Sequence, residues 1–219
     1  MPATVFAPTP ETIRRAADSL RAGQLVILPT DTVYGVCVDA LNASAVRRLY
    51  EAKGKGAEAP LQLLFAPDMA EIERFASLSP AARRLVDALG PGGWTVIVPA
   101  APGWQSPALA GGSTVGFRIP EAPVLHEVIR AFGGPLAASS ANRHSGPSPT
   151  TCAAAAEEVG DACALAIDAG ATPAAIDSTV IDLSHEDSPR ILREGAIDRQ
   201  TVARILGLSE IEVLRSVRP

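Results

Sequence analysis

QLVILPTDTVYGVCVDA, residues 24–40, contains two apolar runs separated by a polar turn. The run at 24–28 has the length and composition of a buried strand, and the run at 33–40 is a second strand, rich in β-branched residues. Between them, the segment PTDT (29–32) places hydroxyls and a carboxylate where strands end. Open α/β sheets bind their ligands at strand ends. The stretch therefore predicts a sheet and a place for a binding site on it.

Helices alternate with further strands along the chain. Thr9 can cap a helix that has Pro10 at its first position and ends near Gly23. Helical spacing or capping predicts further helices at 43–51, 80–90, 121–132, 150–159 and 198–207. Apolar runs predict further strands at 61–65, 94–100, 114–120, 135–139 and 178–183. The alternation predicts a single α/β domain over residues 1–219, with its core at about 10–207 and spacing too uneven for a regular βαβ repeat.

The charge balance excludes a basic nucleic-acid-binding domain. The chain has 19 Lys and Arg residues against 24 Asp and Glu, for a net charge of −5, so any anion site must be built from a few converging cations. Cys37, Cys152 and Cys163 form no CxxC pair, and the three histidines are widely spread. Neither a disulfide framework nor a zinc site is expected. The first residues lack a signal-peptide pattern and no 18-residue apolar run occurs, which predicts a cytoplasmic protein.

Common nucleotide-binding and nucleophile motifs are absent. The chain has no GxxxxGK[ST] loop, no GxGxxG after the first strand and no GxSxG. What remains is a set of polar clusters at predicted strand ends. In the PTDT turn, Thr30 either satisfies local backbone groups or meets a small polar ligand. The pair Lys53 and Lys55 is either a solvated loop or a phosphate clamp, since the glycines beside them permit close backbone approach.

Two more clusters follow later in the chain. SSANRHSGPSPTT (139–151) crowds hydroxyls and an amide behind an apolar strand, as a turn and helix cap or as a site for phosphate or sugar oxygens. Arg118, Ser178 and Arg193 each interrupt or end an apolar strand. An arginine there is either paired or edge-exposed, or it binds an anion. Each cluster alone is a weak signal, so their order along the chain carries the interpretation.

Seven stretches in order resemble the YrdC/Sua5 family of L-threonylcarbamoyladenylate synthases. They are PTDTVYGVCVDA, KGKGAEAPL, GGWTVIVPA, VGFRIP, PLAASSANRHSGPSPTT, DSTVIDL and LREGAI, and they span about Gly23 to Ala196. The resemblance implies a twisted, mostly parallel or mixed α/β sheet flanked by helices around a concave positive cavity. It implies an enzyme, a nucleotidyltransferase that forms threonylcarbamoyl-AMP and pyrophosphate from L-threonine, bicarbonate and ATP. The product serves N6-threonylcarbamoyladenosine synthesis on tRNA, through a separate transferase and accessory proteins.

The resemblance also implies roles for the clusters. Thr30 and Ser178 would contact threonine or its carbamate, and Arg118 would hold the threonine carboxylate. Lys53 and Lys55 occupy the family's K-x-R positions beside the triphosphate and are the expected catalytic cations. The remaining expected ATP contacts are Ser140 and Asn142 of an S-x-N motif, Ser148 and Arg193. With no carboxylate cluster to cage a metal, Mg²⁺ would arrive mainly on the ATP phosphates.

Three departures from the family pattern stand out. Lys55 replaces an arginine and so loses the planar fork, Gly56 replaces a proline, and Leu64 stands where longer relatives often carry a histidine. The length matches the short, single-domain form. Two other functions are weighed: a non-catalytic RNA-binding module, disfavoured by the acidic charge and the lack of stacking aromatics, and a domain that forms carbamoyl-adenylate from carbamoyl phosphate, usually found in much longer chains.

Overall fold

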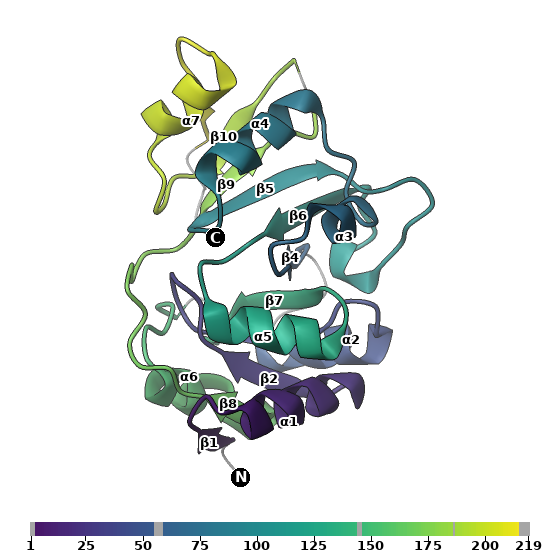
Figure 1. Cartoon of the computed structure of the whole chain (residues 1–219), viewed down its shortest axis with the longest axis vertical. Helices are drawn as coiled ribbons and strands as arrows, with labels where there is room; N and C mark the ends of the chain where they lie inside the picture. Colours follow the sequence, from purple (N-terminus) through teal and green to yellow (C-terminus); the bar gives the residue numbers. More distant parts are fainter. Residues whose placement is uncertain (1–2, 55–58, 144–145, 186, 215–219) are drawn as a thin grey trace.

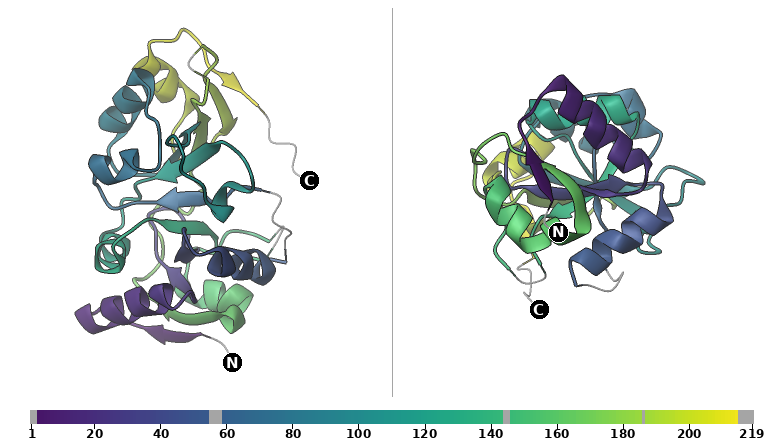
Figure 2. Two further views of the ribbon diagram at one scale, coloured as in Figure 1. Left: turned by 90° about the vertical axis from the view of Figure 1, so that its right-hand side faces the viewer. Right: turned by 90° about the horizontal axis from the view of Figure 1, so that it is seen from below.

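The computed structural model describes residues 3–54, 59–143, 146–185 and 187–214. They form one twisted sheet of eleven strands in the order β1-β8-β2-β3-β7-β4-β6-β5-β9-β10-β11, with helices packed on it (Figure 1). The two ends of the sheet are far apart, and the twist between them is evident when the molecule is viewed from below (Figure 2). The predicted α/β class is confirmed.

The strands are short and mixed in direction. Their bounds are β1 (Thr4–Phe6), β2 (Leu25–Leu28), β3 (Gly35–Asp39), β4 (Gln62–Leu64), β5 (Trp94–Pro99), β6 (Thr114–Arg118), β7 (Leu136–Ser140), β8 (Cys163–Ile167), β9 (Thr179–Asp182), β10 (Arg190–Arg193) and β11 (Glu212–Val213). Across the described ranges, five strand pairings are parallel and five are antiparallel. The sheet is therefore mixed, which the expectation of a mostly parallel or mixed sheet included. Strands β2 and β3 form an antiparallel hairpin rather than a crossover unit.

The helices begin where the sequence supplies caps. They are α1 (Pro10–Arg21), α2 (Ala43–Ala52), α3 (Met69–Glu73), α4 (Pro80–Leu89), α5 (Pro123–Phe132), α6 (Cys152–Val159) and α7 (Arg199–Leu206), with 3-10 turns at Pro107–Leu109 and Gly160–Ala162. Thr9, Ser79 and Asp198 each accept a hydrogen bond from a backbone N–H in the first turn. No helix in the described ranges is long and apolar enough to cross a membrane.

Two apolar cores hold the helices against the sheet. Helices α1 and α5 lie side by side and bury one face over β2, β7 and β8, through residues such as Leu20 and Leu125. The larger core joins α2, α4, α6 and α7 to the sheet and centres on Trp94 and Phe117, whose rings meet edge to face at 5.9 Å. With both cores closed, polar residues of β4, β5, β6, β7 and β10 are left to form a cavity near the middle of the sheet.

Candidate active site

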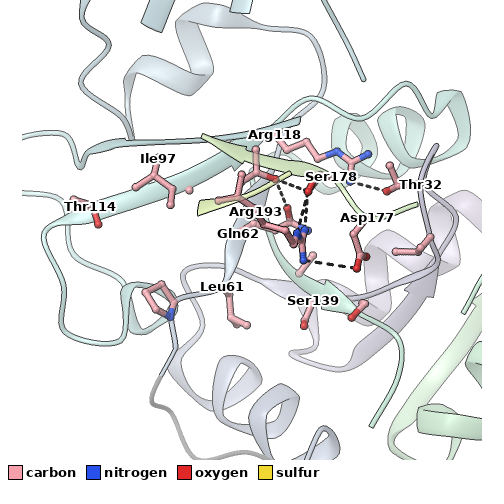
Figure 3. Close-up of a pocket in the computed structure, with 17 residues that line it drawn as sticks. Thr32, Leu61, Gln62, Ile97, Thr114, Arg118, Ser139, Asp177, Ser178 and Arg193 are labelled. Atoms are coloured by element: carbon pink, nitrogen blue, oxygen red, sulfur yellow. Dashed lines mark hydrogen bonds and ion pairs between the residues drawn. The ribbon is translucent and has the colours of Figure 1, made fainter. Parts of the chain in front are cut away.

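A cavity of about 310 Å³ lies over the central strands (Figure 3). Its walls come from β4, β5, β6, β7, β9 and β10 and from the segments that precede β3, β4 and β9. Its titratable side chains among the described residues are Arg118, Asp177 and Arg193. Hydroxyls supply most of the other polar surface. They come from Thr32, Thr95, Thr114, Ser139, Ser140 and Ser178. A cavity with two guanidinium groups and several hydroxyls suits an anionic ligand with further polar atoms.

The PTDT turn engages the Thr30 hydroxyl in local hydrogen bonds. Thr30 Oγ1 accepts from the backbone N–H groups of Thr32 and Val33, at 3.1 and 3.2 Å, and donates to the Val33 carbonyl at 2.6 Å. These bonds close the turn and occupy the Thr30 hydroxyl. Thr32 borders the cavity but is fully buried, and its hydroxyl accepts from Arg118. In this structure Thr32 therefore holds the arginine, and a contact between Thr30 and a ligand stays a prediction.

Arg118 is fixed before any ligand is present. It lies at the end of β6 with 2% of its surface exposed. Its Nε donates to the Gly92 carbonyl at 3.0 Å, one terminal nitrogen donates to Thr32 Oγ1 at 2.8 Å, and the other pairs with Asp31 Oδ1 at 2.5 Å. Burial lowers the pKa of Arg118 and the Asp31 carboxylate opposes that shift, while arginine stays protonated in proteins. The turn and the end of β6 therefore hold the Arg118 guanidinium in one fixed position.

Arg193 is held more loosely. Its Nε donates to the Ser178 carbonyl at 3.0 Å and a terminal nitrogen donates to Ser178 Oγ at 3.2 Å. The ion pair with Asp177 Oδ2 is 3.8 Å long, between side chains that are 43% and 40% exposed. Ser148 donates to the other Asp177 oxygen at 3.1 Å, so this predicted ATP contact is placed at the same end of the cavity.

Glycine makes this arrangement possible. A side chain on Gly195 would overlap the backbone carbonyls of Asp177 and Ser178. The residue after Arg193 and Glu194 must therefore be glycine for the chain to approach the loop that carries the cavity residues. The approach is held by the Ala196 N–H, which donates to the Asp177 carbonyl at 3.1 Å.

Lys53 is not on a solvated loop. It caps the end of α2 with 5% of its surface exposed. Its Nζ donates to the backbone carbonyls of Ser140 and Asn142 at 2.6 and 2.7 Å and lies 3.4 Å from Asn142 Oδ1. A charged donor bound to two carbonyls of one segment fixes the path of that segment. Lys53 therefore fixes the backbone of the S-x-N loop, residues 140–142.

The S-x-N loop is tied internally as well. Ser140 Oγ lies 2.5 Å from Asn142 Oδ1, and the Asn142 amide donates to the carbonyls of Arg143 and Gly146 at 2.9 and 2.7 Å. Ser140 lines the cavity, whereas Asn142 is buried beside it. The predicted contact Lys55 lies outside the residues that the structure describes.

Several cavity residues were not singled out from the sequence. Asp31 and Asp177 lie in the motifs PTDT and DSTVIDL, but the sequence alone did not predict a ligand role for either. Gln62 and Thr95 face each other from β4 and β5, with Thr95 Oγ1 donating to Gln62 Oε1 at 3.0 Å. A polar residue in an otherwise apolar strand, as in LQLLF and WTVIVPA, is the signal that could have found them.

The described residues contain no cluster of metal-ligand side chains and no exposed cysteine. No group of three or more His, Cys, Asp and Glu side chains is arranged there to hold a metal ion. The three cysteines are buried thiols. Burial raises the pKa of Cys152 to about 11 and that of Cys163 to about 12, which disfavours the thiolate.

Fold and site together define a protein with a mixed α/β sheet and a cavity lined by two arginines and several hydroxyls. The family model for Sua5/YciO/YrdC proteins, described as "Telomere recombination", matches residues 18–195. The chain belongs to this family. Its resemblance to the family in motif order is thereby confirmed.

Named relatives are similar over most of the chain. A putative threonylcarbamoyl-AMP synthase of Mycobacterium tuberculosis (strain H37Rv) is 37% identical over 193 residues, which is 88% of each chain. The threonylcarbamoyl-AMP synthase of Bacillus subtilis (strain 168) is 36% identical over 89% of this chain and 56% of its own length. The crystal structure of P. abyssi Sua5 complexed with L-threonine superposes with a TM-score of 0.88 at 33% identity, covering 96% of this chain and 61% of that one.

Proposed function

We propose that this protein is an L-threonylcarbamoyladenylate synthase, a nucleotidyltransferase that uses L-threonine, bicarbonate and ATP. The carrying observation is a cavity lined by the guanidinium groups of Arg118, at the end of β6, and Arg193, at the end of β10, with hydroxyls between them and no nucleophile–base pair among its described residues. Relatives that are named threonylcarbamoyl-AMP synthase, and a similar Sua5 structure with L-threonine bound, support this assignment.

The chemistry requires positioning and charge stabilisation rather than a protein nucleophile. The threonine ammonium and bicarbonate give an N-carboxylate, with release of water and one proton. An oxygen of that carboxylate then forms a bond to the ATP α-phosphorus, the α–β phosphoanhydride bond breaks, and pyrophosphate leaves with its electron pair. Groups held in line and stabilised by fixed cations can supply most of the acceleration of such a transfer.

The residues divide between the two substrates. Arg118, already fixed by Asp31 and Thr32, would receive the threonine carboxylate with the guanidinium edge that faces the cavity. Ser178 lies between Arg118 and Arg193 and would contact the same amino acid. Thr30 would act by holding the turn whose Thr32 hydroxyl binds Arg118.

The ATP phosphates would lie toward the S-x-N loop. Ser140, Asn142 and Ser148 belong to the segment that Lys53 and Asp177 hold in place. Arg193 is exposed and only loosely paired, so it can turn toward a phosphate at small cost. Lys55 would add a second cation, and Lys55→Arg should preserve or raise activity because it restores the planar fork.

Mg²⁺ would enter with ATP. The cavity offers one described carboxylate, Asp177, which is too few for a protein cage. Mg²⁺ usually keeps several waters and is bound largely by substrate phosphates in such sites. The ion would offset the negative charge of the phosphates.

The tRNA and the threonylcarbamoyl transferase that use the product would act downstream of this protein.

The test is pyrophosphate release by the purified protein in the presence of L-threonine, bicarbonate, ATP and Mg²⁺. We expect release only when all of them are present, and a loss of signal on omission of either threonine or bicarbonate. Release with carbamoyl phosphate in place of threonine and bicarbonate would favour the carbamoyl-adenylate alternative. Salt-dependent RNA binding with no turnover would favour the RNA-binding alternative.

A further inference from the structure

The cavity has two unlike ends (Figure 3). Arg118, Arg193 and Asp177 gather at one end, where an ionic ligand group would bind. Toward Ile97 the wall is more apolar, with Leu61 and Val180 also lining the cavity, and Thr114 supplies a hydroxyl beside Ile97. Gln62 enters between the two ends from β4. An amino acid has the same division, because its charged main-chain groups are at one end and its side chain is at the other.

A directed chain of hydrogen bonds joins Gln62 to the charged end. Arg193 donates to Ser178 Oγ at 3.2 Å, and Thr95 Oγ1 donates to Gln62 Oε1 at 3.0 Å. Ser178 Oγ and Thr95 Oγ1 lie 2.9 Å apart. A hydroxyl has a single hydrogen, and that of Thr95 goes to Gln62. Ser178 is therefore the donor to Thr95, and the order is Arg193, Ser178, Thr95, Gln62.

The end of this chain fixes the Gln62 amide. Its oxygen accepts from Thr95, so its NH₂ group is turned away from Thr95. Among the described residues the structure gives that NH₂ group no hydrogen-bond partner, although the side chain lines the cavity. A donor that is held by its own oxygen and faces a small cavity is well placed to bind an oxygen atom of a ligand.

The floor beside Gln62 is kept open by Gly116. Ile97 lies opposite Gly116 across the β5–β6 pairing. A Cβ on Gly116 would stand 3.5 Å from the Ile97 and Thr95 side chains and would occupy space above the strand. The absence of that atom leaves room for a short side chain between the Gln62 amide and the apolar wall.

We propose that Gln62 is a specificity-determining residue that donates a hydrogen bond to the side-chain hydroxyl of the amino-acid substrate. Thr95 is the positioning residue that orients the amide, and the methyl group of the substrate packs against Ile97 and Val180. The inference rests on the proposed function and adds the atom by which threonine is distinguished from its deoxy analogue, L-2-aminobutyrate.

The test compares L-threonine with L-2-aminobutyrate in the wild type, Gln62→Met and Thr95→Val. Met keeps the length of glutamine and Val keeps the shape of threonine, so both variants should fold with unchanged circular dichroism. The readouts are kcat/KM for pyrophosphate release and the Kd of each amino acid by calorimetry. Wild type should prefer threonine by at least about tenfold, the size of one hydrogen bond that only threonine can make.

The two variants should lose this preference by different amounts. In Gln62→Met the kcat/KM values for the two amino acids should agree within about threefold, chiefly because the value for threonine falls. The preference of Thr95→Val should lie between those of Gln62→Met and wild type. Gly116→Ala should weaken the binding of both amino acids to the same extent, because the added Cβ narrows the cavity beside Gln62. A Gln62→Met protein that folds and keeps the wild-type preference overturns the assignment. A wild-type protein that turns over neither amino acid overturns the proposed function itself, and with it this inference.

Discussion

Two arginines face the same cavity, and they are built in opposite ways. Arg118 is 2% exposed and bonded to a carbonyl, a hydroxyl and the Asp31 carboxylate. Arg193 has a side chain that is 43% exposed, and its ion pair with Asp177 spans 3.8 Å. We call the first group, Arg118 with Asp31, Thr32 and the Gly92 carbonyl, the buried arginine cluster. The second, Arg193 with Asp177 and Ser178, is the exposed arginine cluster.

The two clusters differ in how much of the desolvation and orientation of the arginine is completed during folding. In the buried cluster the charge has already been desolvated and oriented during folding, so a small carboxylate can bind without rearrangement. In the exposed cluster the cation keeps much of its hydration and can follow a larger, more highly charged ligand. The buried arginine cluster, which is rigid, suits an amino acid. The exposed arginine cluster can move, which suits a triphosphate whose charge distribution changes as the reaction proceeds.

The largest effect should come from Arg118→Met. The variant removes the partner of a buried carboxylate and leaves Asp31 uncompensated, which costs about 3 kcal/mol of unfolding free energy. Urea denaturation followed by tryptophan fluorescence measures it, and turnover should be lost as well. Arg193→Met is the matched control, since it removes the same charge from the exposed cluster. Equal destabilisation by the two variants would abolish the distinction between the clusters.

Lys53→Met should come next. Loss of the ammonium removes the donor from the Ser140 and Asn142 carbonyls, at a cost of about 2 kcal/mol, and loosens the S-x-N loop. We expect kcat/KM to fall at least about tenfold. Arg47, exposed on the same helix, provides the control through Arg47→Met, which should change neither quantity. Wild-type kinetics in Lys53→Met would show that the loop does not need this support.

Arg193→Met should affect activity far more than stability. Its side chain is half in solvent, so unfolding free energy should change by less than about 1 kcal/mol. If Arg193 contacts ATP, kcat/KM for ATP should fall at least about tenfold while the Kd for L-threonine changes little. Calorimetry with each substrate separates the two effects. The opposite pattern, with threonine affinity lost and ATP affinity kept, would exchange the proposed roles of the two arginines.

Asp177→Asn should be close to neutral for folding. An ion pair of 3.8 Å between exposed side chains contributes less than about 0.5 kcal/mol. Removing the carboxylate frees Arg193, so ATP should bind equally well or slightly more tightly. The measurements are a thermal melt and the Kd for ATP. Destabilisation on the scale of Arg118→Met would mean that Asp177 belongs to a preformed structure after all.

A smaller, pH-dependent effect belongs to His126, which packs near the buried cluster. Burial lowers its pKa and the nearby Arg130 adds to the shift, while a backbone hydrogen bond to Pro120 and the Asp31 charge oppose it. Because the unfolded chain takes up a proton more readily than the folded one, this contribution is present above the ordinary histidine pKa of about 6.5 and declines as the pH falls below it. Unfolding free energy of wild type should therefore decrease more than that of His126→Gln between pH 7 and about pH 5. Parallel pH profiles for the two proteins would contradict the shift.

Local signals in the sequence predicted much of the fold. Thr9 and Pro10 placed the start of α1, and the apolar runs placed strands such as β5 and β7 within a residue or two. Strand β8 was missed because CALAI is short and follows a helix directly, and it becomes a strand by pairing in parallel with both β1 and β2. The order of the strands could not be predicted locally either, since it depends on partners far away in the chain.

The site was predictable by composition and motif order but not by contact. Arg118 and Asp31 are 87 positions apart, so no local pattern shows that they pair. Only the folded turn shows that the Thr30 hydroxyl bonds the N–H groups of Thr32 and Val33. Lys53 read equally well as a solvated residue, and only the position of the 140–142 loop shows its ammonium to be buried.

The reaction product tests the central claim most directly. The purified protein is incubated with ATP, Mg²⁺, L-threonine and ¹³C-bicarbonate, and the quenched mixture is analysed by mass spectrometry. The account predicts a threonylcarbamoyl-AMP that carries the label in its carbamoyl carbon and that is absent when threonine is omitted. Pyrophosphate release without a labelled threonine adduct, or no adduct under conditions where a threonylcarbamoyl-AMP synthase forms one, would contradict it.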